Sequence, residues 1–200
     1  MSHPTASGKV LVQPQAHPTR HSVIVSDLML RISTEEPIQF VDLTDHINQH
    51  LRRERIENGA VTVFSRHTTA AIKINEAEEL LLEDFKHFLR RLVPIDHAYH
   101  HNDMSRRKPP IAPDERPNAH SHCMHLLLST SETIPVIDSR LALGTWQRVF
   151  LIELDGPRSR EVVVRCHCYT THELSLPLGA KRNGHARIAV NQGAEYSGGK

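Results

Sequence analysis

Histidine is the residue type with the clearest chemical potential in this sequence. The chain of 200 residues contains 16 histidines but only three cysteines. Six of the histidines lie between residues 97 and 125, and His67 lies at the end of a strand-like segment. Neutral imidazole is the commonest protein ligand for zinc, and three protein ligands with an open fourth position are typical of a catalytic zinc site. The segments of His67, His101 and His122 can therefore each supply one ligand to a shared site.

The same histidines have a plainer interpretation as polar residues of a surface loop. On a helix, His122 and His125 share one face and His120 lies on another, so the three do not all bind one ion. His46 and His50 are spaced four residues apart, and they form either a metal-binding pair or part of a solvated helix face.

Other side chains offer acid–base chemistry and substrate contacts. Glu76 and Asp84 are either surface acids or groups that orient a histidine and handle a proton. Arg158 and Arg160 carry guanidinium groups that suit phosphate or carboxylate, although exposed turn arginines often have no ligand. Trp146, the one tryptophan, is either a core residue or a planar wall for a substrate ring.

The elements that must position these groups follow from hydrophobic periodicity and from turn signals. A short helix is expected from Thr44 or Asp45 to about Arg55. A longer helix begins at the N-x-x-E pattern of Asn75 to Glu78, buries the apolar stripe of Leu81, Phe85, Phe88 and Leu92, and stops at Pro94. A further short helix covers residues 121–128. Strand-like segments are residues 22–33, 37–44, 59–66, 71–75, 133–137, 146–154 and 161–168.

The order of these elements predicts an α+β fold. It lacks the regular strand–helix alternation of a doubly wound parallel sheet, so a largely antiparallel or mixed sheet is expected. Asp155-Gly156 indicates a hairpin turn between the last two strands. Cys166 and Cys168 point to one face of the last strand and are expected to be a buried pair.

Length and composition predict one domain over residues 21–172. Residues 1–20 and 173–200 have the Pro, Ser, Thr and Gly content of flexible tails. With 24 Lys and Arg against 23 Asp and Glu, the charge gives no support for a nucleic-acid or membrane partner. No apolar run is long enough to span a bilayer and the start lacks a signal-peptide pattern, so a cytoplasmic protein is expected.

Several familiar catalytic motifs are absent from the sequence. It contains no GxGxxG, Walker A, HExxH or GxSxG pattern. These absences argue against dinucleotide, P-loop, zincin and α/β-hydrolase chemistry.

Five segments together resemble the YjbQ-like family, the secondary thiamine-phosphate synthases. They are VTVFSRHTTAAIKINE, the helix of Asp84, YHHND, NAHSHCMHLLLSTSETIPV and LGTWQRVFLIELDGPRSREVVV. The order of HTTA…NE, GTWQ and DGPRxR is highly specific, and the resemblance covers about residues 21–168. It implies a compact α/β sandwich that assembles as a homotrimer.

The resemblance also implies which positions form the site. It assigns His67, His101 and His122 to a cluster that binds zinc. The other implied site positions are Thr68, Thr69, Asn75, Glu76, Asp84, Trp146, Gln147 and Arg160. His120 stands where the family usually has an acid, Ser129 replaces a usual Gly, and the loop from Asn102 to Pro117 is rich in Pro and Arg.

One function is expected from these features, whether or not it is secondary to another physiological role, and two alternatives stand beside it. The first is thiamine-phosphate synthase activity, in which a hydroxymethylpyrimidine diphosphate joins a thiazole phosphate and pyrophosphate leaves. Its residues are Arg158 and Arg160 on the diphosphate, with Mg²⁺ as a possible aid, and Trp146 beside the pyrimidine. The second is a zinc-dependent hydrolase or lyase. The third is a trimer that binds metal or a small ligand without turnover.

Overall fold

The strands form two antiparallel sheets in the computed structural model, which describes residues 21–111 and 115–171. Sheet A has the order β1-β8-β3-β5-β6 and sheet B the order β2-β7-β4. The strands are β1 His21–Ser33, β2 Gln39–Asp42, β3 Asn58–Ser65, β4 Ala70–Asn75, β5 Ser131–Ile137, β6 Arg140–Leu141, β7 Arg148–Glu153 and β8 Ser159–Thr171. The helices are α1 Thr44–Arg53, α2 Glu79–Leu92 and α3 Ala119–Leu126, with a 3-10 turn η1 at His100–Asn102.

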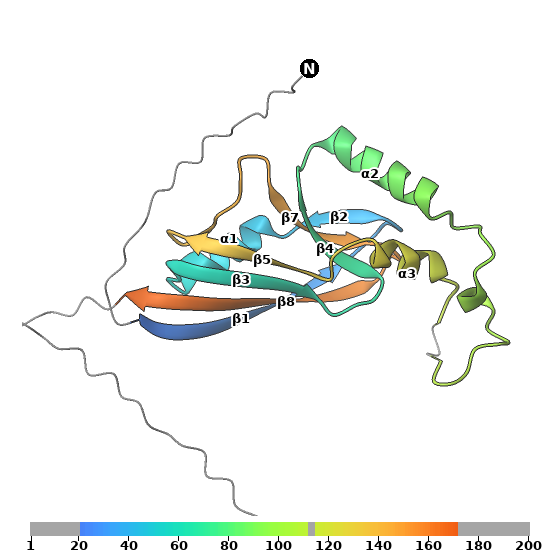
Figure 1. Cartoon of the computed structure of the whole chain (residues 1–200), viewed down its shortest axis with the longest axis horizontal. Coiled ribbons are helices and arrows are strands. Elements are labelled where there is room, and N and C mark those ends of the chain that lie inside the picture. Colours follow the sequence, from blue (N-terminus) through green and yellow to red (C-terminus); the bar gives the residue numbers. More distant parts are fainter. Residues whose placement is uncertain (1–20, 112–114, 172–200) are drawn as a thin grey trace, which may run out of the picture.

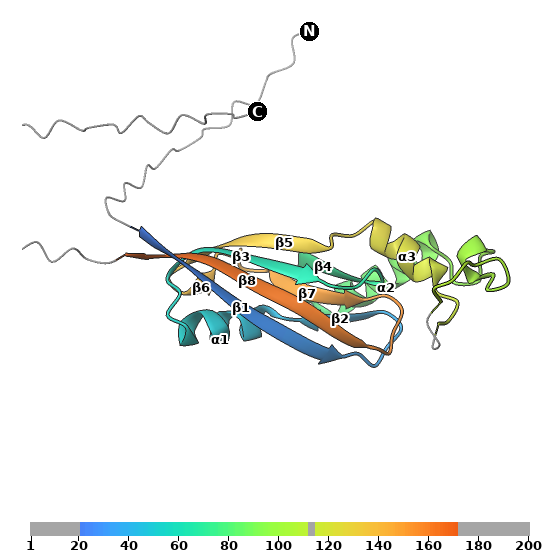
Figure 2. The same cartoon turned by 90° about the horizontal axis from the view of Figure 1, so that it is seen from below.

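A first hydrophobic core lies between the inner face of sheet A and the layer made by sheet B and α1. Successive side chains of each strand in sheet A point to opposite faces of the sheet, so Val61 and Val63 of β3 are buried while Phe64 faces outward. Ile47 and Leu51 of α1 close the core on the other side. Figure 2 shows α1 beside β6, at the end of the molecule opposite α3.

A second hydrophobic core lies between sheet B and the helices α2 and α3. Phe150 and Ile152 of β7 pack there with Leu89 of α2 and Met124 of α3. Because β7 is the central strand of sheet B and is covered on both faces, nearly all of its residues are buried. Figure 1 shows the resulting order of layers, with α2 above sheet B and sheet A below it.

The predicted hairpin at Asp155-Gly156 is wrong. β7 pairs with β2 and β4, whereas β8 pairs with β1 and β3. The turn therefore passes the chain from sheet B to sheet A. The Asp-Gly signal identified a turn correctly, but the apolar strands on both sides have partners that are distant in the sequence.

The start and the buried face of the long helix also differ from the prediction. Asn75 ends β4, and Glu78 caps α2 by accepting hydrogen bonds from the backbone N–H groups of Leu80 (3.0 Å) and Leu81 (2.7 Å). Phe88 and Leu92 of the predicted buried stripe are about half exposed, while Leu89 is buried.

Trp146 and His50 each had two interpretations from the sequence, and the structure excludes one for each. Trp146 is 71% exposed in the turn before β7, which excludes a core role within one chain. His50 is buried, not solvated, and its imidazole contacts Ser26 and Arg53.

Cys166 and Cys168 are buried as predicted, and burial raises the pKa of the Cys166 thiol to about 12.

The predicted α+β class is confirmed, with antiparallel pairing in both sheets. The predicted tails, residues 1–20 and 173–200, lie outside the described residues. No helix in the described part of the chain is long and apolar enough to cross a membrane.

Candidate functional site

One cleft of about 410 Å³ gathers most of the residues expected to do chemistry. It lies where the β3–β4 loop, η1, the start of α3 and the segment between β7 and β8 meet. This histidine cleft is lined by Arg66, His67, Thr68, Thr69, His101, Arg107, Glu115, Asn118, His122, Asp155, Arg158 and Arg160.

The β3–β4 loop that carries His67 is fixed by hydrogen bonds on both sides. The Ser65 hydroxyl donates to the Ala70 carbonyl (2.6 Å), which closes the loop upon itself. The Glu161 backbone N–H donates to Nε2 of His67 at 2.8 Å. A nitrogen that accepts an N–H carries no proton, so neutral His67 holds its proton on Nδ1.

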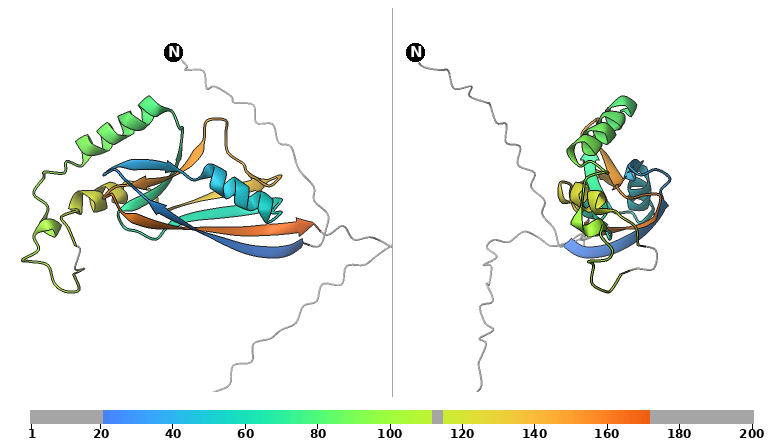
Figure 3. Two further views of the ribbon diagram at one scale, coloured as in Figure 1. Left: turned by 180° about the vertical axis from the view of Figure 1, so that it is seen from behind. Right: turned by 90° about the vertical axis from the view of Figure 1, so that its right-hand side faces the viewer.

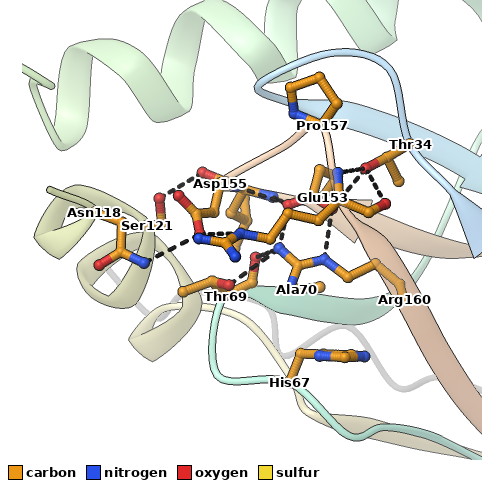
Figure 4. Close-up of polar contacts among 12 residues, drawn as sticks. Thr34, His67, Thr69, Ala70, Asn118, Ser121, Glu153, Asp155, Pro157 and Arg160 are labelled. Carbon is orange, nitrogen blue, oxygen red and sulfur yellow. Dashed lines mark hydrogen bonds and ion pairs between the residues drawn. The ribbon is translucent and has the colours of Figure 1, made fainter. Parts of the chain in front are cut away.

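A buried ion pair supports the end of the same loop. Glu153 and Arg160 are 0% and 3% exposed, and their side chains form two hydrogen bonds, one from Nε to Oε2 at 2.6 Å and one from Nη2 to Oε1. Arg160 also donates to the Thr69 hydroxyl (3.0 Å). Figure 4 shows the guanidinium group of Arg160 between Glu153 and Thr69, with His67 nearby.

Glu153 is fully engaged as an acceptor. It accepts from the Thr34 hydroxyl (2.9 Å) and from the backbone N–H of Asp155 (2.8 Å) in addition to Arg160. Burial alone would raise its pKa, but the Arg160 and backbone hydrogen bonds outweigh burial and lower it. The carboxylate is therefore ionised and structural. Gly156 leaves room for it, because a Cβ at that position would lie only 2.7 Å from Cγ of Glu153.

Two of the expected histidines face each other in the histidine cleft. The rings of His101 and His122 lie 5.0 Å apart between centroids, at 75°. Nε2 of His101 is buried without a hydrogen-bond partner among the described residues, and Oε1 of Glu115 is 3.9 Å from it. Burial, followed by the charge of His101, lowers the pKa of His122. Burial, followed by the charge of Arg160, lowers that of His67.

The acidic residues of the cleft are held by arginine. Glu115 accepts from Arg107 at 2.7 Å, and Asp155 accepts from Arg158 at 2.8 Å and from the Asn118 amide at 3.0 Å. Four arginines and two carboxylates line the cleft, and the other two arginines, Arg66 and Arg160, pair with Glu161 and Glu153, which do not line it.

Zinc fits this cleft only in part. His101 and His122 are close enough to share an ion, and the unpartnered Nε2 of His101 is suited to a ligand. His67 must release the Glu161 N–H before its Nε2 can bind a metal. Within residues 21–111 and 115–171, no group of three or more His, Cys, Asp or Glu side chains is arranged to hold a metal ion. Mg²⁺ fits poorly, because both carboxylates already bind arginine.

The remaining expected site residues lie elsewhere. Glu76 and Trp146 line a separate cavity of about 260 Å³ with Arg148, and the Gln147 side chain accepts from the Gly144 N–H. Asn75 lines an apolar pocket under α2, and Asp84 is exposed on α2. Within one chain, the structure does not bring these five residues into the histidine cleft.

Sequence reasoning missed several polar residues of the site. The sequence motifs assign no role to Glu153, Asn118, Arg107 or Glu115. Glu153 had a usable signal, because a carboxylate inside the apolar run VFLIEL is expected to be buried and paired. Arg107 and Glu115 lie in the Pro-rich loop, where the sequence has no periodic pattern.

The sequence of this chain matches that of a known protein family. The model of the family described as UPF0047 protein YjbQ-like matches residues 29–168. The chain belongs to the YjbQ-like family. A UPF0047 protein of Methanothermobacter thermautotrophicus is 41% identical over 142 residues, which are 71% of this chain and 90% of that protein. The YugU protein of Bacillus subtilis is 29% identical over 68% of this chain and 95% of its own length.

Solved structures of YjbQ-like proteins share the fold. A protein of unknown function from Sulfolobus solfataricus matches with a TM-score of 0.65 and 32% identity, over 74% of this chain and 99% of that one. A protein from Clostridium acetobutylicum matches with a TM-score of 0.61 and 30% identity, over 70% and 98% of the two chains. The YjbQ-like assignment covers every element that forms the histidine cleft.

Proposed function

We propose that the histidine cleft is an enzyme active site for a small phosphate-bearing substrate. The observation that carries this proposal is the meeting of His67, His101 and His122 with four arginines in one cleft. Guanidinium groups bind phosphate oxygens through paired, charge-assisted hydrogen bonds. Each neutral histidine beside them has one N–H group that can donate a hydrogen bond to an anion.

The specific reaction we propose is thiamine-phosphate synthesis, which the family resemblance implies. The C–O bond between the pyrimidine methylene and the diphosphate breaks, and its electron pair leaves with the diphosphate. The ring nitrogen of the thiazole phosphate then forms the new C–N bond with its lone pair. Neither step needs a proton transfer, so the cleft acts by binding and by stabilising negative charge on the departing diphosphate.

The residues of the cleft divide these tasks by their surroundings. Arg107 and Arg158 contact the leaving diphosphate, since they line the cleft and are about one-fifth to one-quarter exposed. Arg160 is a positioning residue, because it is buried and holds Thr69. The crossed rings of His101 and His122 offer the planar contact for the pyrimidine, because Trp146 lies outside this cleft.

An assay with purified protein tests this proposal. Hydroxymethylpyrimidine diphosphate and thiazole phosphate are supplied, and thiamine phosphate is measured by chromatography. We expect His67→Ala to lose about 100-fold in rate, because it removes the Nδ1–H donor that neutral His67 offers to the departing diphosphate. His87→Ala is the matched control, because His87 is exposed on α2. Product no higher with the wild-type protein than with His67→Ala would contradict the proposal.

A zinc-dependent hydrolase or lyase is the second candidate function. It is supported by the unpartnered Nε2 of His101 beside the ring of His122. Elemental analysis of the protein purified without added metal, with His101→Ala as the comparison, measures zinc per chain. Zinc near one per chain that is lost in the variant supports this candidate, and a metal-free folded protein contradicts it.

We propose further that the chain assembles as a homotrimer, the state implied by the resemblance. The outer face of sheet A supports assembly, because no described helix covers it. Its exposed apolar residues are Val25, Met29, Phe64 and Ile137. Burying such residues against another copy removes their apolar surface from water.

A further inference from the structure

A second pocket lies between α2 and sheet B, and the function proposed above does not use it. Its volume is about 160 Å³. Figure 3 shows α2 over the strands of sheet B, on the side away from sheet A. This phenyl pocket is lined by Phe40, Lys73, Asn75, Phe85, Phe88, Leu89, Leu128, Phe150 and Ile152.

The walls of the phenyl pocket are packed against one another. The ring centroid of Phe40 is 5.9 Å from that of Phe150, at 83°, and 5.9 Å from that of Phe85, at 36°. Leu89 is buried and fastens the C-terminal half of α2 to the second core. These contacts brace the rings around the space.

The mouth of the phenyl pocket is polar but carries no unpaired charge. Nζ of Lys73 lies 3.3 Å from the Glu132 carboxylate and 3.1 Å from the Ser129 hydroxyl. The Asn75 amide oxygen accepts the Glu76 N–H at 2.9 Å. Phe88, which is 55% exposed, lies at the same opening. A charged ligand finds no complementary free charge here.

Size and lining together indicate the class of ligand. An apolar cavity of about 150 Å³ stays dry and accepts a benzene-sized molecule. Four phenyl rings offer edge and face contacts to another aromatic ring. Asn75 and Lys73 at the mouth can donate to a hydroxyl or carbonyl group on that ring.

We propose that the phenyl pocket binds a neutral single-ring aromatic group whose polar substituent lies at the mouth, beside Lys73 and Asn75. This ligand site is separate from the histidine cleft. Two short segments connect them. Thr69, just before β4, lines the cleft and Lys73 of β4 lines the pocket, while His122 of α3 lines the cleft and Leu128, two residues after α3, lines the pocket.

Titration of the full-length protein with phenol and with benzene tests the proposal. We expect saturable binding of phenol at one site per chain, observed by calorimetry and by ligand NMR. Leu128→Trp places a large ring in the pocket and is expected to weaken binding at least about tenfold. Leu127→Trp is the matched control, because Leu127 is exposed one residue earlier and does not line the pocket. Lys73→Met is expected to weaken phenol binding but not benzene binding.

The outcomes that overturn the proposal are equally specific. They are no saturable binding of either probe to the wild-type protein, or equal loss in Leu127→Trp and Leu128→Trp. If Leu128→Trp fails to fold by circular dichroism, Phe88→Trp fills the pocket from the exposed side of α2 and decides the question. Pyrophosphate binding, measured in parallel, is expected to be unchanged by Leu128→Trp, so failure of this site and failure of the histidine cleft are distinguishable.

Discussion

At the scale of single residues, Glu153 helps to hold the wall of the histidine cleft in place. It holds Arg160, and Arg160 holds Thr69 at the end of the loop that carries His67. Both partners of the ion pair are buried, so neither charge can be satisfied by water if the other is removed. A buried pair of this kind is costly to break from one side.

Glu153→Gln is therefore expected to lower the free energy of unfolding by about 3–5 kcal/mol. Urea denaturation measures the change. Glu36→Gln, which removes an exposed carboxylate paired with Lys86, is the control and is expected to cost about 1 kcal/mol or less. Arg160→Met added to Glu153→Gln is expected to recover part of the loss, because it removes the unpaired buried cation. Equal effects of the Glu153 and Glu36 variants would refute this account of the pair.

The histidines around the cleft are expected to make the stability of the protein depend on pH. Burial is the largest cause that lowers the pKa values of His67, His120, His122 and His125 from the usual 6.5. In the unfolded chain these groups bind protons near pH 6.5, whereas in the folded chain they bind them only at lower pH. Below pH 6.5 the unfolded state therefore holds more protons, and stability falls as pH falls.

Urea unfolding at pH 7.5 and pH 5.5 is expected to show lower stability at pH 5.5. His125→Asn is expected to reduce the difference between the two values, because burial is the cause of the lowered pKa of His125. The same stability at both pH values would show that these histidines titrate alike in the folded and unfolded chains.

The sequence predicted the histidines of the cleft, together with Thr68, Thr69, Arg158 and Arg160, which also line it. His67, His101 and His122 come from three separate segments, and the resemblance and the chemistry of imidazole both selected them. Trp146 and Glu76 were grouped with them, yet they line a different cavity. Motifs show which residue types occur together along the chain, but the path of β4 separates Thr69, just before the strand, from Glu76, just after it.

At the scale of elements, α2 depends on its first turn. The N-terminal half of the helix has little buried surface, and Leu80 is 73% exposed. Glu78 supplies the cap, with hydrogen bonds to the N–H groups of Leu80 and Leu81. A carboxylate at this position also interacts favourably with the positive end of the helix dipole.

Glu78→Ala is expected to destabilise the protein by about 0.5–2 kcal/mol. The amide protons of the first turn of α2 are expected to exchange faster with solvent. Glu79→Ala is the matched control, since Glu79 makes no cap hydrogen bond in the described structure and lies one residue further along. Equal amide-proton exchange rates in the two variants would show that Glu78 does not cap α2.

The elements themselves were largely predictable, and their partners were not. The apolar runs and the Pro94 stop gave the positions of most strands and helices. The link at Asp155-Gly156 shows the limit, because a turn signal is local while the pairing of β8 with β1 and β3 joins residues far apart in the sequence. The face that α2 buries was misassigned for the same reason, since it depends on where sheet B lies.

At the scale of the whole molecule, the uncovered face of sheet A is expected to hold the trimer together. Light scattering of the wild-type protein should give about three times the chain mass of 22.7 kDa. Met29→Glu combined with Phe64→Glu places charges on that face and should give a monomer. Leu126→Glu, at a residue that is 84% exposed on α3, should leave the mass unchanged. A monomeric wild-type protein would end this proposal.

The histidine cleft as an anion-binding active site is the central claim, and calorimetric titration with inorganic pyrophosphate tests it most directly. We expect pyrophosphate to bind at one site per chain, and Arg107→Gln to weaken this binding about tenfold or more. Arg140→Gln, an exposed arginine of β6 outside the cleft, should bind as the wild type does. No binding to the wild-type protein, or equal affinity in the Arg107 and Arg140 variants, would contradict the claim.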